Sequence, residues 1–237
     1  MAVVVTGYVR LDSQHRSHAR YVELGRRLVG LGLPTIAFYD GSPAELMPTP
    51  KSAILRTRLA DCWMAPGAAK CEAPGGTPLK DTTSYCAVQH QKTTWLARAA
   101  ADTGEAVVWI DFGIFHLPQI NNRHVLKFVE RVEAAPPDRI TIAGIWPMPG
   151  RPMINWTKPA WYVAGGVVVV PHRLAGWFDA TVRSYATLQM DASRRTTWEV
   201  NTWSAILRDH PDRFRVYAAD HDETLFTNYE KAPPCVR

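Results

Sequence analysis

The sequence contains few cysteines and no long apolar run, and each shortage narrows the class of protein. Four cysteines, Cys62, Cys71, Cys86 and Cys235, are too few in 237 residues for a scaffold held by disulfides. No stretch approaches the roughly 20 uninterrupted apolar residues of a membrane-spanning helix. The N-terminal apolar run ends before Arg10 and is shorter than the apolar region of a signal peptide. We therefore expect a cytoplasmic protein with reduced thiols.

Paired CxxC spacing is also absent, which disfavours a zinc site. An alternative joins Cys62, Cys71 and Cys86 to His90 as a tetrahedral set, because Cys86 and His90 can face the same way on a helix. Ordinary reduced thiols remain the default interpretation.

What the chain does contain is typical of a compact α/β protein. Hydrophobic residues make up 46% and charged residues 21%, enough to bury a large core. A formal net charge of +5 favours anionic ligands such as nucleotide sugars, anionic glycans or nucleic acid. The basic residues are scattered, and Arg194 with Arg195 is too small a group for a nucleic-acid patch. With no repeat and no linker, residues 1–237 are expected to form one domain.

Hydrophobic periodicity predicts alternating strands and helices. Residues 2–6 read as a buried parallel strand, residues 21–31 as an amphipathic helix and residues 33–39 as a second strand. This βαβ beginning places ligand-binding loops at the carboxyl ends of the strands. Further strands are expected at 52–56, 106–110, 139–145, 161–170 and 213–217, and further helices at 88–102, 120–135, 174–188 and 199–207. Residues 42–86, rich in Pro, Gly and Ala, are expected to form an irregular excursion.

Asp111 is the most informative candidate residue, because it follows the buried strand at 106–110 directly. A carboxylate in that place lies at the sheet edge where α/β proteins bind ligands. Together with the diphosphate of a nucleotide-sugar donor, this carboxylate would hold a divalent cation, Mn²⁺ or Mg²⁺. Gly113 would allow close approach of the sugar. The alternative is an aspartate that only caps a helix or a turn.

Two glycines and two carboxylate segments are further candidates. Gly165 and Gly166 interrupt a β-forming run, which indicates either a bulge beneath a sugar ring or a bend needed for packing. Glu199 begins a helix whose apolar residues face inward. It is therefore predicted to point toward the crevice as an acid/base or a partner of sugar hydroxyls, unless it only stabilises the helix dipole.

The segment Asp220, His221 and Asp222 follows the last predicted strand. It is a candidate for closing over a metal and diphosphate, and an exposed acidic turn is the alternative. Lys92, near the start of the helix predicted at 88–102, is a candidate phosphate or donor contact, although a solvated lysine is the commoner outcome.

Taken in order, these segments resemble the HtrL/WlaTC-like bacterial glycosyltransferases, which are similar to the GT-A class of nucleotide-sugar-dependent enzymes. The resemblance spans most of the chain. The matching stretches are VVVTGYVRL with YVELGRRLV, IAFYD, QKTTWLARAA, VVWIDFGIFHL, AGGVVVVP, WEVNTWSAIL, HPDRFRVY and TLFTNY. WIDFGI is the most specific of them. The implied fold is a GT-A-like (Rossmann-like), mostly parallel sheet flanked by helices.

The resemblance also implies roles for individual residues. Asp111 matches the acidic motif that binds metal and diphosphate, although Gly113 stands where a second acid is common. His221 or Asp222 would then complete the metal site. The implied donor-binding residues are Thr6, Gly7, Tyr8, Arg10, Lys92, Asp111, Gly113, Gly165 and Gly166, with Tyr8 stacking on the base. Glu199 matches the acidic residue of the acceptor side, and residues 47–86 would shape the acceptor pocket.

The leading hypothesis is transfer of a sugar, in the manner of a hexosyltransferase, from a UDP- or GDP-sugar to a glycan or another hydroxyl acceptor. Asp111 would position the leaving group and Glu199 would act as acid/base. Three alternatives remain: the same chemistry on a modified DNA base, a non-catalytic nucleotide- or carbohydrate-binding protein, and a metal-dependent hydrolase using Asp111, His221 and Asp222.

Overall fold

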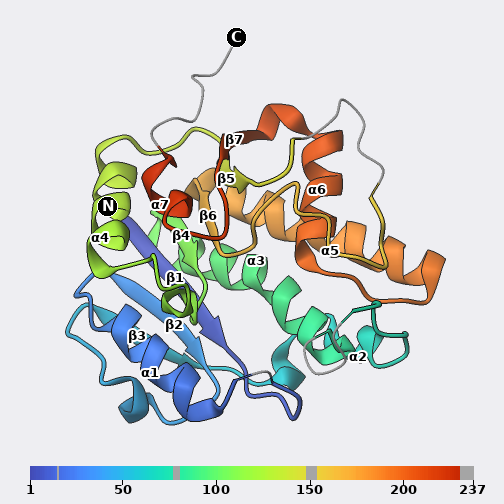
Figure 1. Ribbon diagram of the computed structural model, residues 1–237, viewed down its shortest axis with the longest axis horizontal. Coiled ribbons are helices and arrows are strands. Elements are labelled where there is room, and N and C mark those ends of the chain that lie inside the picture. The colour runs from blue at the N-terminus through green and yellow to red at the C-terminus, as the bar shows by residue number, and fades with distance from the viewer. Residues whose placement is uncertain (15, 77–80, 148–153, 230–237) are drawn as a thin grey trace.

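One mixed sheet of seven strands organises the part of the chain that the computed structural model describes, residues 1–14, 16–76, 81–147 and 154–229. The strand order is β3-β2-β1-β4-β6-β5-β7 (Figure 1). The strands are β1 (Ala2–Tyr8), β2 (Thr35–Tyr39), β3 (Ser52–Arg56), β4 (Ala106–Ile110), β5 (Ile140–Gly144), β6 (Val167–Val170) and β7 (Phe214–Ala218). Of these seven, β6 alone runs antiparallel to its neighbours. The predicted α/β class with a mostly parallel sheet is confirmed.

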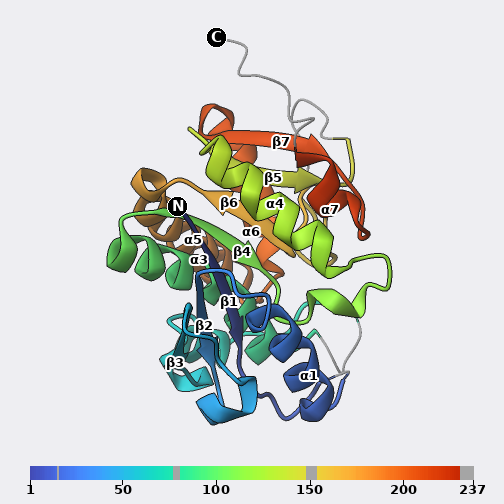
Figure 2. The same ribbon diagram turned by 90° about the vertical axis from the view of Figure 1, so that its left-hand side faces the viewer.

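Helices cover both faces of the sheet (Figure 2). The α-helices are α1 (His18–Val29), α2 (Ala65–Ala68), α3 (Thr83–Thr103), α4 (Asn122–Ala134), α5 (His172–Ser193), α6 (Glu199–Asp209) and α7 (Thr224–Thr227). One core layer packs α3, α5 and α6 against the sheet, and the opposite layer packs α1, α4 and α7. None of the helices in the described ranges is both long enough and apolar enough to cross a bilayer.

The strands are buried on both faces because their side chains alternate between these two layers. In β1, Val3 and Val5 pack into the layer of α3, whereas Ala2 and Val4 pack into the layer of α4. This two-sided burial is the reason that the strands read as continuous apolar runs rather than as alternating patterns.

Three expectations about element boundaries differ from the structure. The helix predicted at 88–102 begins earlier, at Thr83, because the Thr82 hydroxyl accepts the Tyr85 N–H at 3.1 Å and caps it. The strand predicted at 161–170 is confined to β6, so the two glycines precede the strand and do not interrupt it. Residues 42–86 hold the predicted strand β3 and, in addition, α2 and the short helices Pro43–Leu46 and Leu59–Asp61, so the excursion is less irregular than predicted.

Candidate functional site

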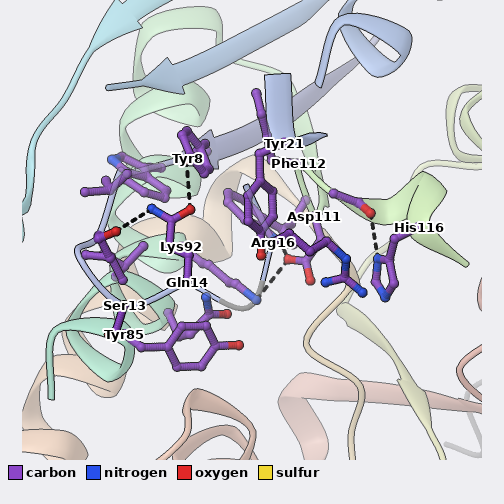
Figure 3. A pocket seen from close by; sticks show the side chains of 18 residues that line it. Tyr8, Ser13, Gln14, Arg16, Tyr21, Tyr85, Lys92, Asp111, Phe112 and His116 are labelled. Carbon is purple, nitrogen blue, oxygen red and sulfur yellow. Dashed lines mark hydrogen bonds and ion pairs between the residues drawn. The ribbon is translucent and has the colours of Figure 1, made fainter. Parts of the chain in front are cut away.

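A cavity of about 250 Å³ opens at the carboxyl ends of β1 and β4 (Figure 3). Gly7 and Tyr8 line it from β1, and Asp111 to Gly113 line it from the turn after β4. Parallel strands place their carboxyl ends at one edge of the sheet, where open α/β folds bind ligands. The first strand's exit and Asp111 therefore line one cavity, whereas Gly165, Gly166 and the residues Asp220 to Asp222 are not among its lining residues.

One wall of the cavity is a face of α3. Tyr85, Val88, Gln89 and Lys92 all line it. Their spacing of three, four and seven residues puts them on one side of a helix. The loop between β1 and α1 supplies Ser13, Gln14 and Arg16, and His116 lies at the far rim.

An aromatic cluster forms the wall nearest to β1. The ring of Tyr8 stacks on Phe112 with centroids 5.2 Å apart and interplanar angle 21°, and Tyr21 lies 5.0 Å from Tyr8. Both rings beside Tyr8 also line the cavity. Stacked aromatic faces of this kind bind flat, partly apolar groups such as a nucleobase.

Two hydrogen bonds fix the Tyr8 hydroxyl. It donates to Gln14 Oε1 at 2.9 Å and lies 3.1 Å from His18 Nδ1. Burial raises the pKa of Tyr8 to about 12, with the Gln14 hydrogen bond opposing that rise. Burial and the nearby carboxylates of Glu199 and Asp111 also raise the pKa of Tyr85 well above its usual range. Both phenols are therefore neutral hydrogen-bonding groups at physiological pH.

The floor of the cavity contains a buried ammonium group held by three oxygens. Lys92 Nζ lies 2.8 Å from Glu199 Oε1, 3.0 Å from Asp111 Oδ1 and 3.0 Å from the carbonyl oxygen of Gly165. We call Lys92 and these three oxygen ligands the lysine cage. The side chains of Lys92 and Glu199 are 3% and 7% exposed, whereas that of Asp111 is 39% exposed. Asp111 is thus the member of the cage with substantial access to solvent.

The lysine in the cage is charged. Burial opposes the ammonium form, but the carboxylates of Asp111 and Glu199 outweigh that penalty and hold the pKa of Lys92 above its ordinary value. The rings of Trp109 and Trp203 lie 5.5 and 6.0 Å from Nζ and favour the cation further. The expectation of a solvated lysine is therefore wrong, because the cage supplies the partners that a buried ammonium requires.

Asp111 is oriented by groups of the sheet itself. Its Oδ1 accepts a hydrogen bond from Trp109 Nε1 at 2.7 Å in addition to the contact with Lys92. Its backbone N–H donates to the Gly166 carbonyl at 2.9 Å, directly beyond the register pair Ile110 and Val167. Oδ1 of the carboxylate is therefore held by Trp109 and Lys92, whereas Oδ2 takes part in neither contact.

Gly165 has a steric reason that the sequence did not reveal, whereas a side chain at Gly166 would meet only ordinary contacts. A Cβ on Gly165 would stand 2.2 Å from Glu199 Oε1, so only glycine lets the carboxylate reach Lys92 across this backbone. A Cβ on Gly166 would stand 3.7 Å from Asp111 Oδ2. The group that comes close to Gly165 is thus a side chain of the protein itself.

The predicted donor-binding residues divide into two sets. Five line the cavity: Gly7, Tyr8, Lys92, Asp111 and Gly113. Four do not. Thr6 is fully buried, and Arg10 is exposed and donates its backbone N–H to Asp40. The carbonyl of Gly165 accepts from Lys92, and that of Gly166 accepts the Asp111 N–H.

Glu199 also departs from its predicted placement. It begins α6 as expected, but its side chain is buried and Lys92 lies between it and Asp111. It does not line the cavity. The Glu199 side chain points inward because it pairs with the Lys92 ammonium, and a buried carboxylate is retained only where it is paired.

The ligands predicted for a divalent metal ion do not gather at one site in the described part of the chain. Asp222 Oδ1 accepts the Thr224 N–H at 2.8 Å at the start of α7, and His221 packs edge-on against Trp161 at 4.6 Å and pairs with Asp220. The described part of the chain contains no group of three or more His, Cys, Asp or Glu side chains able to hold a metal. Asp111, His221 and Asp222 therefore form no ready metal cluster.

The lack of a metal-binding group among the described residues also applies to the alternative zinc set, Cys62, Cys71, Cys86 and His90. The ring of His90 is fully buried, with Nδ1 2.8 Å from the Cys86 carbonyl oxygen and Nε2 2.9 Å from Thr202 Oγ1. Both ring nitrogens are engaged. The cysteines at 62, 71 and 86 are free thiols.

Several cavity residues were not among the predicted site residues: Gln14, Arg16, Tyr21, Tyr85, Gln89, Trp109, Phe112 and His116. Tyr85 and Gln89 precede Lys92 by seven and three residues, a spacing that places the three side chains on one face of a helix. The residues of the loop after β1 carry no such periodicity.

Comparison with known proteins shows the fold class. No known protein family matches the sequence, and no curated protein sequence is similar to it. The crystal structure of mouse xyloside xylosyltransferase 1, apo form, is similar with a TM-score of 0.50 and 13% identity, over 91% of this chain and 85% of that chain. The chain therefore shares its overall fold with that structure. Membership of the HtrL/WlaTC-like family is not confirmed.

Proposed function

We propose that this protein is a glycosyltransferase that moves a sugar from a nucleoside-diphosphate sugar, such as a UDP- or GDP-sugar, to a hydroxyl group of a glycan or another acceptor. The observation that supports it most is the single cavity joining the exit of β1 to Asp111 after β4 on a GT-A-type sheet. The name of the similar structure, a xylosyltransferase, supports sugar transfer as the reaction class but does not identify the sugar that this protein transfers.

The cavity offers a separate environment for each part of such a donor. The stacked rings of Tyr8 and Phe112 suit the base. Arg16 and His116, lining the same cavity, suit the phosphates. Asp111, as an acceptor of hydrogen bonds, suits the hydroxyl groups of the ribose or the sugar.

In the reaction, the bond from the anomeric carbon to the diphosphate breaks and its electron pair leaves on the nucleoside diphosphate, a bond from the anomeric carbon to the acceptor oxygen forms, and the proton of the acceptor hydroxyl is released to water. Asp111 is the carboxylate that faces the cavity, so we assign substrate contact to it. Glu199 holds Lys92, and Lys92 holds Asp111. We therefore replace the acid/base role predicted for Glu199 by a positioning role. The predicted Mn²⁺ or Mg²⁺ forms no part of this proposal, because the donor set does not fit it.

A donor screen tests the proposal. Melting temperature and release of nucleoside diphosphate are measured with a panel of nucleotide sugars and hydroxyl acceptors. One donor should raise the melting temperature and be consumed. Asp111→Asn should lower kcat/KM by about tenfold or more, because a hydrogen bond to a charged group contributes about 1.5–3 kcal/mol.

Asp102→Asn is the matched control, because Asp102 lies exposed at the end of α3 and forms an ion pair with Arg98 at 3.7 Å. It should leave both measurements unchanged. Donor binding without turnover would point to a non-catalytic binding protein, and hydrolysis with no acceptor requirement would point to a hydrolase. Asp111→Asn with wild-type binding and turnover would refute the role of the cavity. No observation favours a nucleic-acid acceptor.

A further inference from the structure

The lysine cage has the composition of a cation site. Its oxygens come from three separate places: the turn after β4 gives Asp111, the segment before β6 gives Gly165, and the first turn of α6 gives Glu199. Two carboxylates and a backbone carbonyl are the oxygen ligands that Mg²⁺, Mn²⁺ and Ca²⁺ take in proteins. Here the cation among them is the ammonium of Lys92.

The cage uses the full bonding capacity of that ammonium. Lys92 Nζ has three N–H donors and no acceptor, and three oxygens lie within 3.0 Å of it. Glu199 Oε1 can reach it because Gly165 carries no Cβ, which would stand 2.2 Å from that oxygen. The group therefore has no donor left for a ligand, and it acts on a ligand only through Asp111.

We propose that the Lys92 ammonium is the resident cation of this site, so that the protein binds its nucleotide-sugar donor without a divalent metal. The statement about the donor rests on the proposed function, whereas the statement about the cation rests on the cage alone. The proposal also explains why glycine can occupy position 113, where the GT-A pattern often has a second acid. If no metal is bound, no second metal ligand is required there.

The charge balance of the cage indicates which part of the donor meets Asp111. Two carboxylates and one ammonium leave one net negative charge, and Asp111 is the more exposed of the two carboxylates. A negative group attracts hydroxyl donors and repels phosphate oxygens. The diphosphate is therefore expected on the side of Arg16 and His116, with sugar or ribose hydroxyls at Asp111.

Direct measurement of Mn²⁺ binding tests the cation without any donor. Full-length protein freed of metals with EDTA is titrated with Mn²⁺, and the free ion is followed by electron paramagnetic resonance. Wild type should show no stoichiometric site that depends on Asp111. Stoichiometric binding by wild type that disappears in Asp111→Asn would overturn the proposal.

A variant that empties the cage supplies the converse test. Lys92→Ala leaves two carboxylates and a carbonyl without their cation, so Mn²⁺ should now bind. At a hundredfold excess over the dissociation constant, Mn²⁺ should raise the melting temperature of the variant by roughly 5–10 °C. Wild type and the surface control Lys51→Ala should not respond. A folded Lys92→Ala that ignores Mn²⁺ would contradict the cation role, and if that variant does not fold, the wild-type titration decides.

Donor turnover separates this inference from the proposed function. Where a donor is found, kcat/KM should be the same in EDTA and in Mn²⁺, and loss of turnover in EDTA with recovery in Mn²⁺ would refute the metal-free donor site. Where no nucleotide sugar binds while the Mn²⁺ results are as expected, the proposed function fails and the resident cation stands.

Discussion

Replacement of Lys92 by methionine tests the energetics of the cage most directly. Methionine retains a long unbranched side chain, so the change removes the charge and little of the volume. The substitution leaves the Glu199 side chain, which is 7% exposed, without its ion-pair partner Lys92. Asp111 loses the same partner but keeps the hydrogen bond from Trp109.

The expected cost follows from the burial of each partner. Removing one member of a buried pair typically costs about 3–5 kcal/mol, because an uncompensated charge remains. That range applies to the contact with Glu199. The contact with Asp111, whose side chain is 39% exposed, is screened by water and adds at most about 1 kcal/mol. For a chain of 237 residues, a loss of about 3 kcal/mol corresponds to a fall in melting temperature of roughly 6–12 °C.

The pH dependence has a definite sign. The folded-state pKa of Lys92 is raised, so its stabilising contribution is complete below its unfolded pKa and is lost only as pH rises through the folded value. In wild type this contribution is therefore constant from pH 5 to pH 9. Lys92→Met removes this contribution, so its deficit against wild type should be the same at pH 7 and at pH 9.

Urea unfolding followed by circular dichroism measures both effects, with Lys51→Met as the exposed control. The double variant Lys92→Met with Glu199→Gln removes the buried charge and should recover part of the loss. A deficit below about 1 kcal/mol at pH 7, typical of an exposed pair, would refute the reasoning that the pair is buried and paired in solution.

Three further outcomes are expected. Gly165→Ala places a Cβ 2.2 Å from Glu199 Oε1 and should cost about 1–3 kcal/mol in urea unfolding, whereas Gly176→Ala, with no atom within 4 Å, should be neutral or stabilising. Trp109→Phe removes the donor to Asp111 Oδ1 and should cost at least about 1.5 kcal/mol. Native alkylation should modify half-buried Cys71 before the thiols at 62 and 86, because burial raises the pKa of both to about 12, and equal rates in the native state would contradict their burial.

The fold and the location of the cavity were predictable because both depend on local patterns. Buried β-branched runs mark each strand, and the carboxyl ends of parallel strands share one edge of a sheet. The position of Asp111 directly after β4 therefore sufficed to bring it beside Gly7 and Tyr8.

The cage was not predictable, for two physical reasons. Helix α3 is buried on several faces, with His90, Gln91 and Lys92 all inside, so it has no polar stripe from which the inward direction of Lys92 can be read. The partners of Lys92 also lie far along the chain, 73 residues away at Gly165 and 107 residues away at Glu199. Pairing over such separations is decided by tertiary packing and leaves no periodic signal.

The one reversed strand explains how the distant parts meet. Because β6 is antiparallel to β4, the residue before β6 lies beside the residue after β4, and Gly166 accepts the Asp111 N–H at 2.9 Å. Were β6 parallel, the start of that strand would lie at the opposite edge of the sheet, and Gly165 could not reach Lys92. Of the two predicted glycines, Gly165 is the one with a close neighbour, the Glu199 carboxylate. The direction of β6 therefore determines that the groups meeting at Gly165 are the protein's own lysine and carboxylate.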